Sequence, residues 1–132
     1  MEKNYLRIDK TTERAVHDIL KSQAEARIYL YLLRKRRARS EDIIRGTKLY
    51  PSTVRELLSK MYTHKIISRE KLKNGSIGKN PYLYYAVPPR KLLQKYVIEL
   101  EGTLNKIAHL TKESDNDTKY VQIIIHEKIE EI

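Results

Sequence analysis

The stretch "PSTVRELLSK", residues 51–60, carries hydroxyl, guanidinium, carboxylate and ammonium groups at helical spacing. Successive residues of a helix differ in direction by about 100°, so its apolar and polar side chains separate onto two faces. The apolar face comprises Val54, Leu57, Leu58 and Met61. The polar side chains on and beside the opposite face are Ser52, Thr53, Arg55, Glu56, Ser59 and Lys60. Such a face offers the hydrogen-bonding groups that base edges and phosphates require.

Each polar side chain of this face suits a particular group of a nucleic acid. Arg55 can donate two hydrogen bonds to the edge of a guanine, and Ser52 and Thr53 lie in the half of the helix that would meet bases. Glu56 can accept from a cytosine amino group or tune specificity by repulsion. Ser59 and Lys60 lie further along the helix and suit contacts with phosphate. The alternative is a solvated helix face without a partner.

The residues before this helix predict a second, shorter helix and a tight turn. Ser40 is expected to cap a helix over residues 41–45, and Gly46 to end it in a left-handed conformation. Residues 47–50 then form a turn, and Pro51 opens the polar helix, as proline does at a first helical position. Two short helices joined by such a turn are typical of a helix-turn-helix.

Two β-rich runs follow, "KIISREKLK" and "PYLYYAV", joined by the turn-forming residues "NGSIGKN". A hairpin directly after a helix-turn-helix forms a wing. We expect its basic tip to reach a DNA backbone or minor groove through Lys71, Lys73, Asn74, Ser76 and Lys79. Leu83, Tyr85 and Val87, or their neighbours in the opposite register, would fasten the second strand to the core. The tyrosines fall on periodic faces, which favours core positions over a base-stacking platform.

The run "RKRRAR", residues 34–39, adds positive charge before the helix-turn-helix. Arg34 and Lys35 suit the negative end of the preceding helix dipole. Arg37 and Arg39 precede the helix that Ser40 is expected to cap, where free amides can bind phosphate. We therefore include these two arginines and Ser40 in the predicted interface.

Net charge is concentrated in the middle of the chain. Residues 34–95 hold 17 Lys/Arg against 4 Asp/Glu, or +13, and the remainder holds 10 against 13, or −3, which together give the net charge of +10. A field concentrated on one part of a protein attracts polyanions there. A solvated basic surface would carry the same charge without a partner.

The flanking sequences predict helices. Residues 12–21 have helical period, and "SQAE" at Ser22 reads as a capping box in which Ser22 and Glu25 bond each other's amides. The buried stripe of the helix that follows is expected to comprise Ala24, Ile28, Tyr31 and Leu32.

A long helix is expected from Pro89 onward. Its coiled-coil-like stripe is longer than the small core needs, so we expect homodimerisation through it. The residues expected at that interface are Leu93, Tyr96, Leu100, Leu104, Ile107 and Leu110. Residues 118–132 are ambiguous. A helix would align Val121, Ile124, Ile125, Ile129 and Ile132, and it is favoured because "EKIEE" continues the period. A strand would align Val121, Ile123 and Ile125, and β-branching favours it.

Several classes of function find no support. The chain has no cysteine, which excludes disulfides and thiolate metal sites. Its histidines, His17, His64, His109 and His126, lack metal-pair spacing, and no catalytic motif is present. We therefore expect no metal, no cofactor and no enzymatic activity. No signal-peptide core or membrane-spanning run occurs, so a cytoplasmic location is expected.

Three stretches together resemble the winged helix-turn-helix domain of archaeal TrmB-type transcription regulators. They are "SQAEARIYLYLL", "RARSEDIIRGTKLYPSTVRELLSKMYTHKIIS" and "PYLYYAVPPRKLL". The last is the most specific, because an aromatic strand ending in Ala-Val-Pro-Pro before a leucine-rich helix is characteristic of that family. The resemblance covers roughly residues 22–95.

The resemblance implies a mainly α fold with a small β wing and a C-terminal coiled-coil-like dimerisation helix. The expected domains are an N-terminal extension (1–21), the winged helix-turn-helix (22–88) and the dimerisation helix with its tail (89–132). The implied function is sequence-specific binding of double-stranded DNA by a dimeric archaeal transcription regulator. Full-length members carry a C-terminal sugar-binding domain, whereas this sequence stops at Ile132, so no effector site is carried over.

Two other functions stay open from the sequence. Winged helices also serve as protein-interaction modules in transcription or assembly complexes, although those usually lack a basic recognition face. A chromatin or RNA binder without sequence preference would show the same charge. The sequence does not name an operator, target genes, or the direction of regulation.

Overall fold

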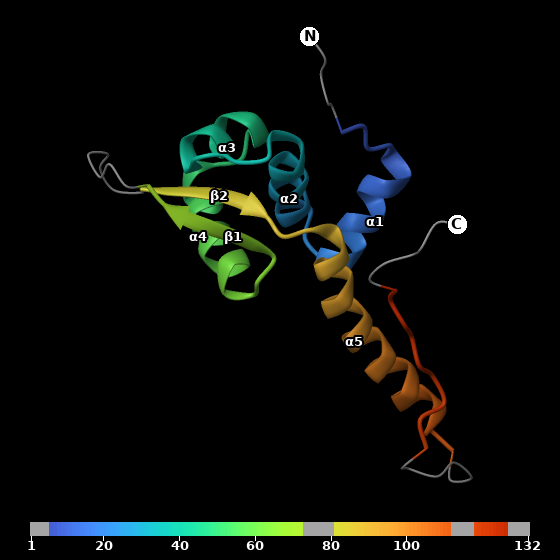
Figure 1. Ribbon diagram of the computed structural model, residues 1–132. Coiled ribbons are helices and arrows are strands. Elements are labelled where there is room, and N and C mark those ends of the chain that lie inside the picture. Colours follow the sequence, from blue (N-terminus) through green and yellow to red (C-terminus); the bar gives the residue numbers. More distant parts are fainter. Residues whose placement is uncertain (1–5, 73–80, 112–117, 127–132) are drawn as a thin grey trace, which may run out of the picture. The chain divides into compact units, whose positions relative to one another are not determined.

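The structure, a computed structural model, describes residues 6–72, 81–111 and 118–126 (Figure 1). Its elements are α1 (Lys10–Leu20), α2 (Gln23–Lys35), α3 (Ser40–Thr47), α4 (Pro51–Thr63), β1 (Ile67–Lys71), β2 (Tyr82–Ala86) and α5 (Pro89–Ala108). The prediction of a mainly helical winged helix-turn-helix is confirmed. The chain forms two compact units, Met1–Val87 and Pro88–Ile132.

Local capping groups set the ends of the first two helices. The Asp9 carboxylate accepts from the Thr12 amide at 2.8 Å, so α1 begins at Lys10, earlier than predicted, and this hydrogen bond lowers the pKa of Asp9. Lys21 ends α1 in the left-handed region. The Ser22 hydroxyl then accepts from the Glu25 amide at 3.1 Å, which confirms the predicted cap of α2.

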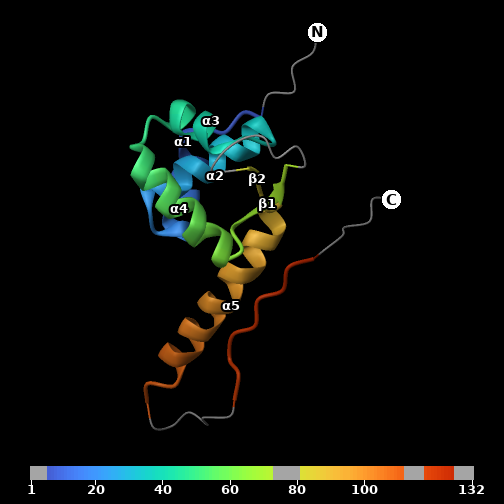
Figure 2. The same ribbon diagram turned by 90° about the vertical axis from the view of Figure 1, so that its left-hand side faces the viewer.

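The core of the first unit is built around α2, which packs against α1, α3, α4 and β2 (Figures 1 and 2). Because neighbours lie on several sides, burial extends beyond the single predicted stripe. Tyr31 and Ala24 are only half-buried, and Tyr29 is buried in their place. The fully buried side chains are Ile28, Tyr29, Leu32, Ile43, Val54, Leu58, Met61 and Ile67. Leu57 of the predicted apolar face of α4 is half-buried.

Strand β2 is paired along both edges. On one edge it runs antiparallel to β1, with Arg69 opposite Tyr84 and Lys71 opposite Tyr82. On the other edge Ala38 and Tyr84 exchange backbone hydrogen bonds of 3.0 and 2.8 Å. Tyr84 is only 4% exposed, so the strand has the opposite of the two registers considered above. This pairing fixes the base of the wing.

A buried tyrosine ties α2 to the end of the hairpin. The Tyr29 hydroxyl donates to the Val87 carbonyl at 2.7 Å, and burial raises the pKa of Tyr29 to about 12. Replacing Tyr29 by Phe keeps the ring but leaves the carbonyl without this donor. We expect a loss of about 1 kcal/mol in the free energy of unfolding, measured by urea denaturation near neutral pH.

The same variant should alter the alkaline limit of stability. Because the folded pKa lies above the ordinary value of 10.0, the stabilisation from neutral Tyr29 is complete below that value and is lost as pH rises towards about 12. The stability advantage of the unaltered protein over Tyr29→Phe should therefore shrink above pH 10. A constant difference between the two proteins across this range would contradict the assignment.

In the second unit, residues 118–126 run back along α5 as an extended segment (Figures 1 and 2). The Asn105 side chain accepts from the Tyr120 and Val121 amides at 2.9 and 3.0 Å and donates to the Val121 carbonyl at 3.0 Å. The Glu101 carboxylate accepts from the Ile123 amide at 3.0 Å. These side chains satisfy backbone groups that a helix would pair internally.

The favoured helical interpretation of this segment is therefore wrong for residues 118–126. Val121, Ile123 and Ile125 are half-buried and Ile124 is exposed, which is the alternation that the strand interpretation described. Lys119 adds an ion pair with Glu101 at 2.8 Å, and this contact, with the Ile123 amide, lowers the pKa of Glu101. Residues 127–132 lie outside the described residues.

Candidate nucleic-acid interface

The turn between α3 and α4 differs from the prediction at Gly46. This glycine lies inside α3, and Lys48 takes the left-handed conformation (φ 62°) that ends the helix. A Cβ added at Gly46 would collide with the Tyr31 ring, so the glycine serves a close helix–helix approach. Thr47, the last residue of α3, is buried, and its carbonyl accepts from the Arg27 guanidinium of α2.

The start of α3 also differs from the prediction. Arg39 is the N-cap residue, and its amide donates to the Asp42 carboxylate at 3.2 Å. Ser40 is the first helical residue and only 5% exposed, so it neither caps the helix nor offers a contact surface, and we remove it from the interface. The acidic Glu41 and Asp42 in the first turn oppose phosphate binding there.

Helix α4 presents the polar face that the sequence indicates. Pro51 is its first residue, as predicted, and the buried Val54, Leu58 and Met61 fix the orientation of the helix. Ser52, Arg55, Glu56 and Ser59 are exposed, and Thr53 is half-buried. The Arg55 side chain has no hydrogen bond, ion pair or ring contact with any other described residue. It is therefore available to an external partner.

Lys60 has a structural partner that the sequence did not reveal. Its Nζ lies 3.2 Å from a Glu25 carboxylate oxygen, and the Glu25 side chain is only 5% exposed. The carboxylate that was expected to complete the capping box of α2 thus pairs with α4. This ion pair joins the start of α2 to the predicted recognition helix, and Lys60 has a role besides phosphate contact.

Replacing Lys60 by Met should destabilise the protein by about 2 kcal/mol, because a nearly buried carboxylate would lose its counter-ion. Urea denaturation measures the loss. Arg55→Met is the matched control, since it removes a cation from the same helix but leaves no buried carboxylate without a partner. We expect it to change the free energy of unfolding by no more than about 0.5 kcal/mol. Adding Glu25→Gln to Lys60→Met should recover most of the stability. Equal losses in the two single variants would refute the role of the pair.

A stacked arginine connects the hairpin to α4. The Arg69 guanidinium lies 3.9 Å from the ring centre of Tyr62, near the end of α4, and 4.0 Å from that of Tyr82 on β2. Such stacks combine cation–π attraction with dispersion. Sequence alternation placed Arg69 and Tyr82 on strands, but only the register and the position of α4 show that Tyr62 completes the stack.

Other predicted contacts are partly engaged within the protein. Arg37 lies 2.9 Å from the Glu70 carboxylate and 5.4 Å from the Tyr85 ring, yet more than half of its side chain is exposed. Arg39 is half-buried, with its Nε buried and 3.7 Å from Glu41. Lys71 is exposed at the end of β1. The predicted tip contacts Lys73, Asn74, Ser76 and Lys79 lie outside the described residues.

The predicted dimerisation stripe remains partly accessible along α5 and just beyond its end, where Leu110 lies. Leu93, Ile107 and Leu110 are exposed, and Tyr96, Leu100 and Leu104 are half-buried. The extended tail is bonded to Glu101 and Asn105, each of which follows a stripe leucine by one position and so lies about 100° round the helix from it. The hydrogen bonds of the tail are therefore made beside the stripe.

Among the residues that the structure describes, no group of three or more His, Asp or Glu side chains is arranged to hold a metal ion. None of the helices in this part of the chain is long and apolar enough to cross a membrane.

Comparison with known proteins identifies the family. The model of a family described as "Sugar-specific transcriptional regulator TrmB" matches residues 22–90, just over half of the chain. A solved structure described as a possible transcriptional regulator from Methanosarcina mazei Go1 has a similar fold, with a TM-score of 0.61 and 20% identity over 83% of this chain and 100% of that one. A search of curated proteins found no match. The chain belongs to the TrmB family, whose members are transcription regulators and not enzymes.

Proposed function

We propose that this protein binds specific double-stranded DNA as a homodimer, with α4 in the major groove and the hairpin on the backbone or minor groove. It would thereby regulate transcription in the cytoplasm of an archaeal cell. The proposal is supported by the order α3, turn, α4 and hairpin, which is that of winged helix-turn-helix proteins, whose second helix enters the major groove.

The proposal rests on the exposure of Arg55 and on its lack of a partner among the described residues. Three other basic side chains of the first unit are already engaged: Arg27 with the Thr47 carbonyl, Lys60 with Glu25, and Arg69 between two tyrosines. Arg55 is exposed on the outward face of α4, between the exposed Ser52 and Ser59, and has no partner among the described residues. It can therefore bind a guanine edge without breaking an internal contact.

The dimer is supported by the accessible stripe on α5. Apolar side chains at three- and four-residue spacing, of which Leu93, Ile107 and Leu110 are exposed, are typical of a helix that packs on a partner. In a symmetric dimer two copies of α4 would face half-sites about one helical turn apart. We therefore expect an approximately palindromic binding site.

Arg55→Ala and Lys71→Ala should affect DNA binding differently. The binding site is first selected from a random duplex pool by the unaltered protein. Arg55→Ala should then weaken binding to that site by about tenfold or more and relax the preference at one position of each half-site. Lys71→Ala should weaken the selected site and unrelated duplexes by the same factor. Fluorescence anisotropy with both duplexes measures the two effects.

The two variants serve as matched controls, because each removes one exposed cation. If Arg55→Ala weakened all duplexes equally, Arg55 would be a phosphate contact and not a base contact. If no sequence emerged from the selection, or double-stranded RNA competed as well as the selected duplex, the protein would be a binder without sequence preference. A partner protein retained at high salt without DNA would favour an interaction module.

A further inference from the structure

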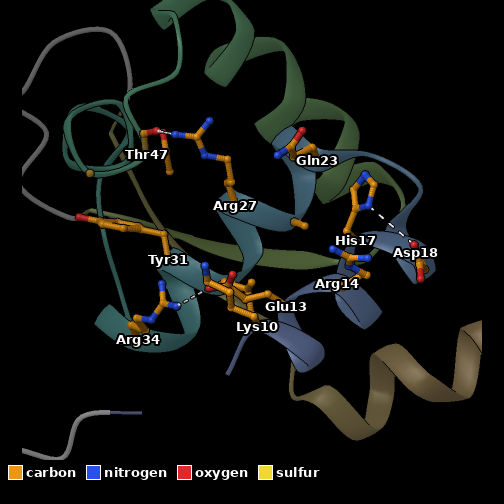
Figure 3. Close-up of a pocket in the computed structure, with 13 residues that line it drawn as sticks. Lys10, Glu13, Arg14, His17, Asp18, Gln23, Arg27, Tyr31, Arg34 and Thr47 are labelled. Carbon is orange, nitrogen blue, oxygen red and sulfur yellow. Dashed lines mark hydrogen bonds and ion pairs between the residues drawn. The ribbon is translucent and has the colours of Figure 1, made fainter. Parts of the chain in front are cut away.

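A polar cavity of about 840 Å³ lies between α1, α2 and α3, and none of the residues assigned to DNA lines it (Figure 3). Helix α1 supplies Lys10, Glu13, Arg14 and His17, which recur at three- and four-residue spacing and thus share one side of that helix. None of the residues of α1 is buried. The volume falls within the range of roughly 300–1,000 Å³ that is common for small-molecule sites.

Only some of the basic side chains around the cavity have a carboxylate partner. Arg34 lies 3.4 Å from the Glu13 carboxylate, and His17 lies 3.7 Å from that of Asp18 (Figure 3). Lys10 and Arg14 have no hydrogen bond or ion pair with another described residue. Arg27 reaches only a neutral carbonyl, that of Thr47 (Figure 3). Three cations therefore face the cavity without a carboxylate of their own.

Helix α2 adds a tyrosine to the lining of the cavity. Tyr31 is half-buried and lies against Gly46, and the pKa of its hydroxyl is raised chiefly by burial, with a further contribution from Asp42. The hydroxyl therefore stays neutral and can donate a hydrogen bond to an anion. Gln23 of α2 also lines the cavity and has an amide that can donate.

We propose that this cavity is a binding site for a small organic anion with two or more carboxylate or phosphate groups. Lys10 and Arg14 of α1 and Arg27 of α2 bind its charges, and Tyr31 forms part of the wall. Charged hydrogen bonds from guanidinium groups to carboxylate or phosphate are among the strongest that side chains make. A neutral ligand would gain no charge–charge attraction from these three exposed cations.

The site is connected to the predicted recognition helix through one residue. Arg27 donates to the carbonyl of Thr47, which ends α3, and only Lys48, Leu49 and Tyr50 separate Thr47 from α4. An anion that draws the Arg27 guanidinium into the cavity removes this donor from the end of α3. If the proposed DNA binding holds, the ligand acts on the turn that positions α4.

Isothermal titration calorimetry of the full chain with citrate and with pyrophosphate tests the site directly. The double variant Lys10→Ala/Arg14→Ala should weaken binding of the anion by about tenfold or more, because two charged contacts are lost. Both side chains are exposed and have no partner among the described residues, so the variant should keep the melting temperature of the unaltered protein. Arg14→Gln alone should weaken binding in the same direction.

Arg55→Ala/Lys71→Ala is the matched control, since it removes the same charge from the proposed DNA-binding surface. It should bind the anion as tightly as the unaltered protein. An equal loss in both double variants would show general charge attraction, and a loss confined to the control would place the anion on the DNA surface; both results overturn the proposal. So does the absence of binding by both anions at millimolar concentration. None of these outcomes depends on whether the protein binds DNA.

Discussion

Raising the salt concentration from about 50 to about 200 mM should weaken the proposed binding of the protein to DNA about a thousandfold. Residues 34–95 carry a net +13, and in a dimer this charge is doubled. If six or more phosphates are neutralised, their released counter-ions make the logarithm of the affinity fall with a slope of about −5 or steeper against the logarithm of salt concentration. Fluorescence anisotropy with a labelled duplex gives this slope.

The same measurement also gives the number of subunits that bind one DNA site. Lys71 is exposed at the end of β1. In the proposed mode of binding, Lys71→Ala therefore removes one phosphate contact from each chain. The slope should become shallower by about one unit for a monomer on DNA and by about two units for a dimer. Lys65→Ala is a control, because this exposed lysine lies in the turn between α4 and β1 and is not part of the proposed contacts. An affinity almost independent of salt would refute phosphate neutralisation as the source of binding.

Local signals in the sequence were enough to predict the helix-turn-helix. Pro51 opens α4 and the Ser22 hydroxyl caps α2 because both effects act within one helical turn. The apolar period of α4 likewise predicted the burial of Val54, Leu58 and Met61. These features need no knowledge of neighbouring elements, so the fold could be predicted from them.

The differences arise where a tertiary neighbour determines the role of a residue. Gly46 looks like a helix terminator in sequence, but the ring of Tyr31, fifteen positions earlier, requires a residue without a side chain there. Glu25 looks like half of a capping box, but Lys60 offers a cation at the point where its carboxylate is buried. In each case the partner lies on another helix, so spacing along the chain carries no signal of the contact.

In the candidate site, too, some features follow from local sequence and others depend on tertiary neighbours. The outward face of α4 follows from helical period alone, whereas the role of Arg69 follows from the register of β1 and β2 and from the position of Tyr62. Basic composition therefore overstates the number of available contacts. Arg69 and Lys60 are engaged within the protein, and Arg55 and Lys71 remain exposed.

Replacing Leu100 and Leu104 by Asp should convert the proposed dimer into monomers and weaken the proposed DNA binding by about a hundredfold or more. These leucines lie one turn apart in the stripe of α5, and the tail is hydrogen-bonded to Glu101 and Asn105 beside them. Carboxylates at both positions would have to be desolvated against a partner helix, which is costly. Sedimentation equilibrium measures the loss of dimer, and anisotropy measures the loss of affinity.

Lys106→Asp is the matched control for this double variant. It changes the net charge by the same two units, and Lys106 is exposed about 200° round the helix from Leu104. It should remain dimeric and should bind DNA more tightly than the double variant does. If the Leu100→Asp/Leu104→Asp protein stayed dimeric, the subunits would associate through another surface, and if the unaltered protein were itself a monomer, the stripe would have a different partner. Circular dichroism confirms that α5 keeps its helical content, so that loss of the dimer is not mistaken for loss of the helix.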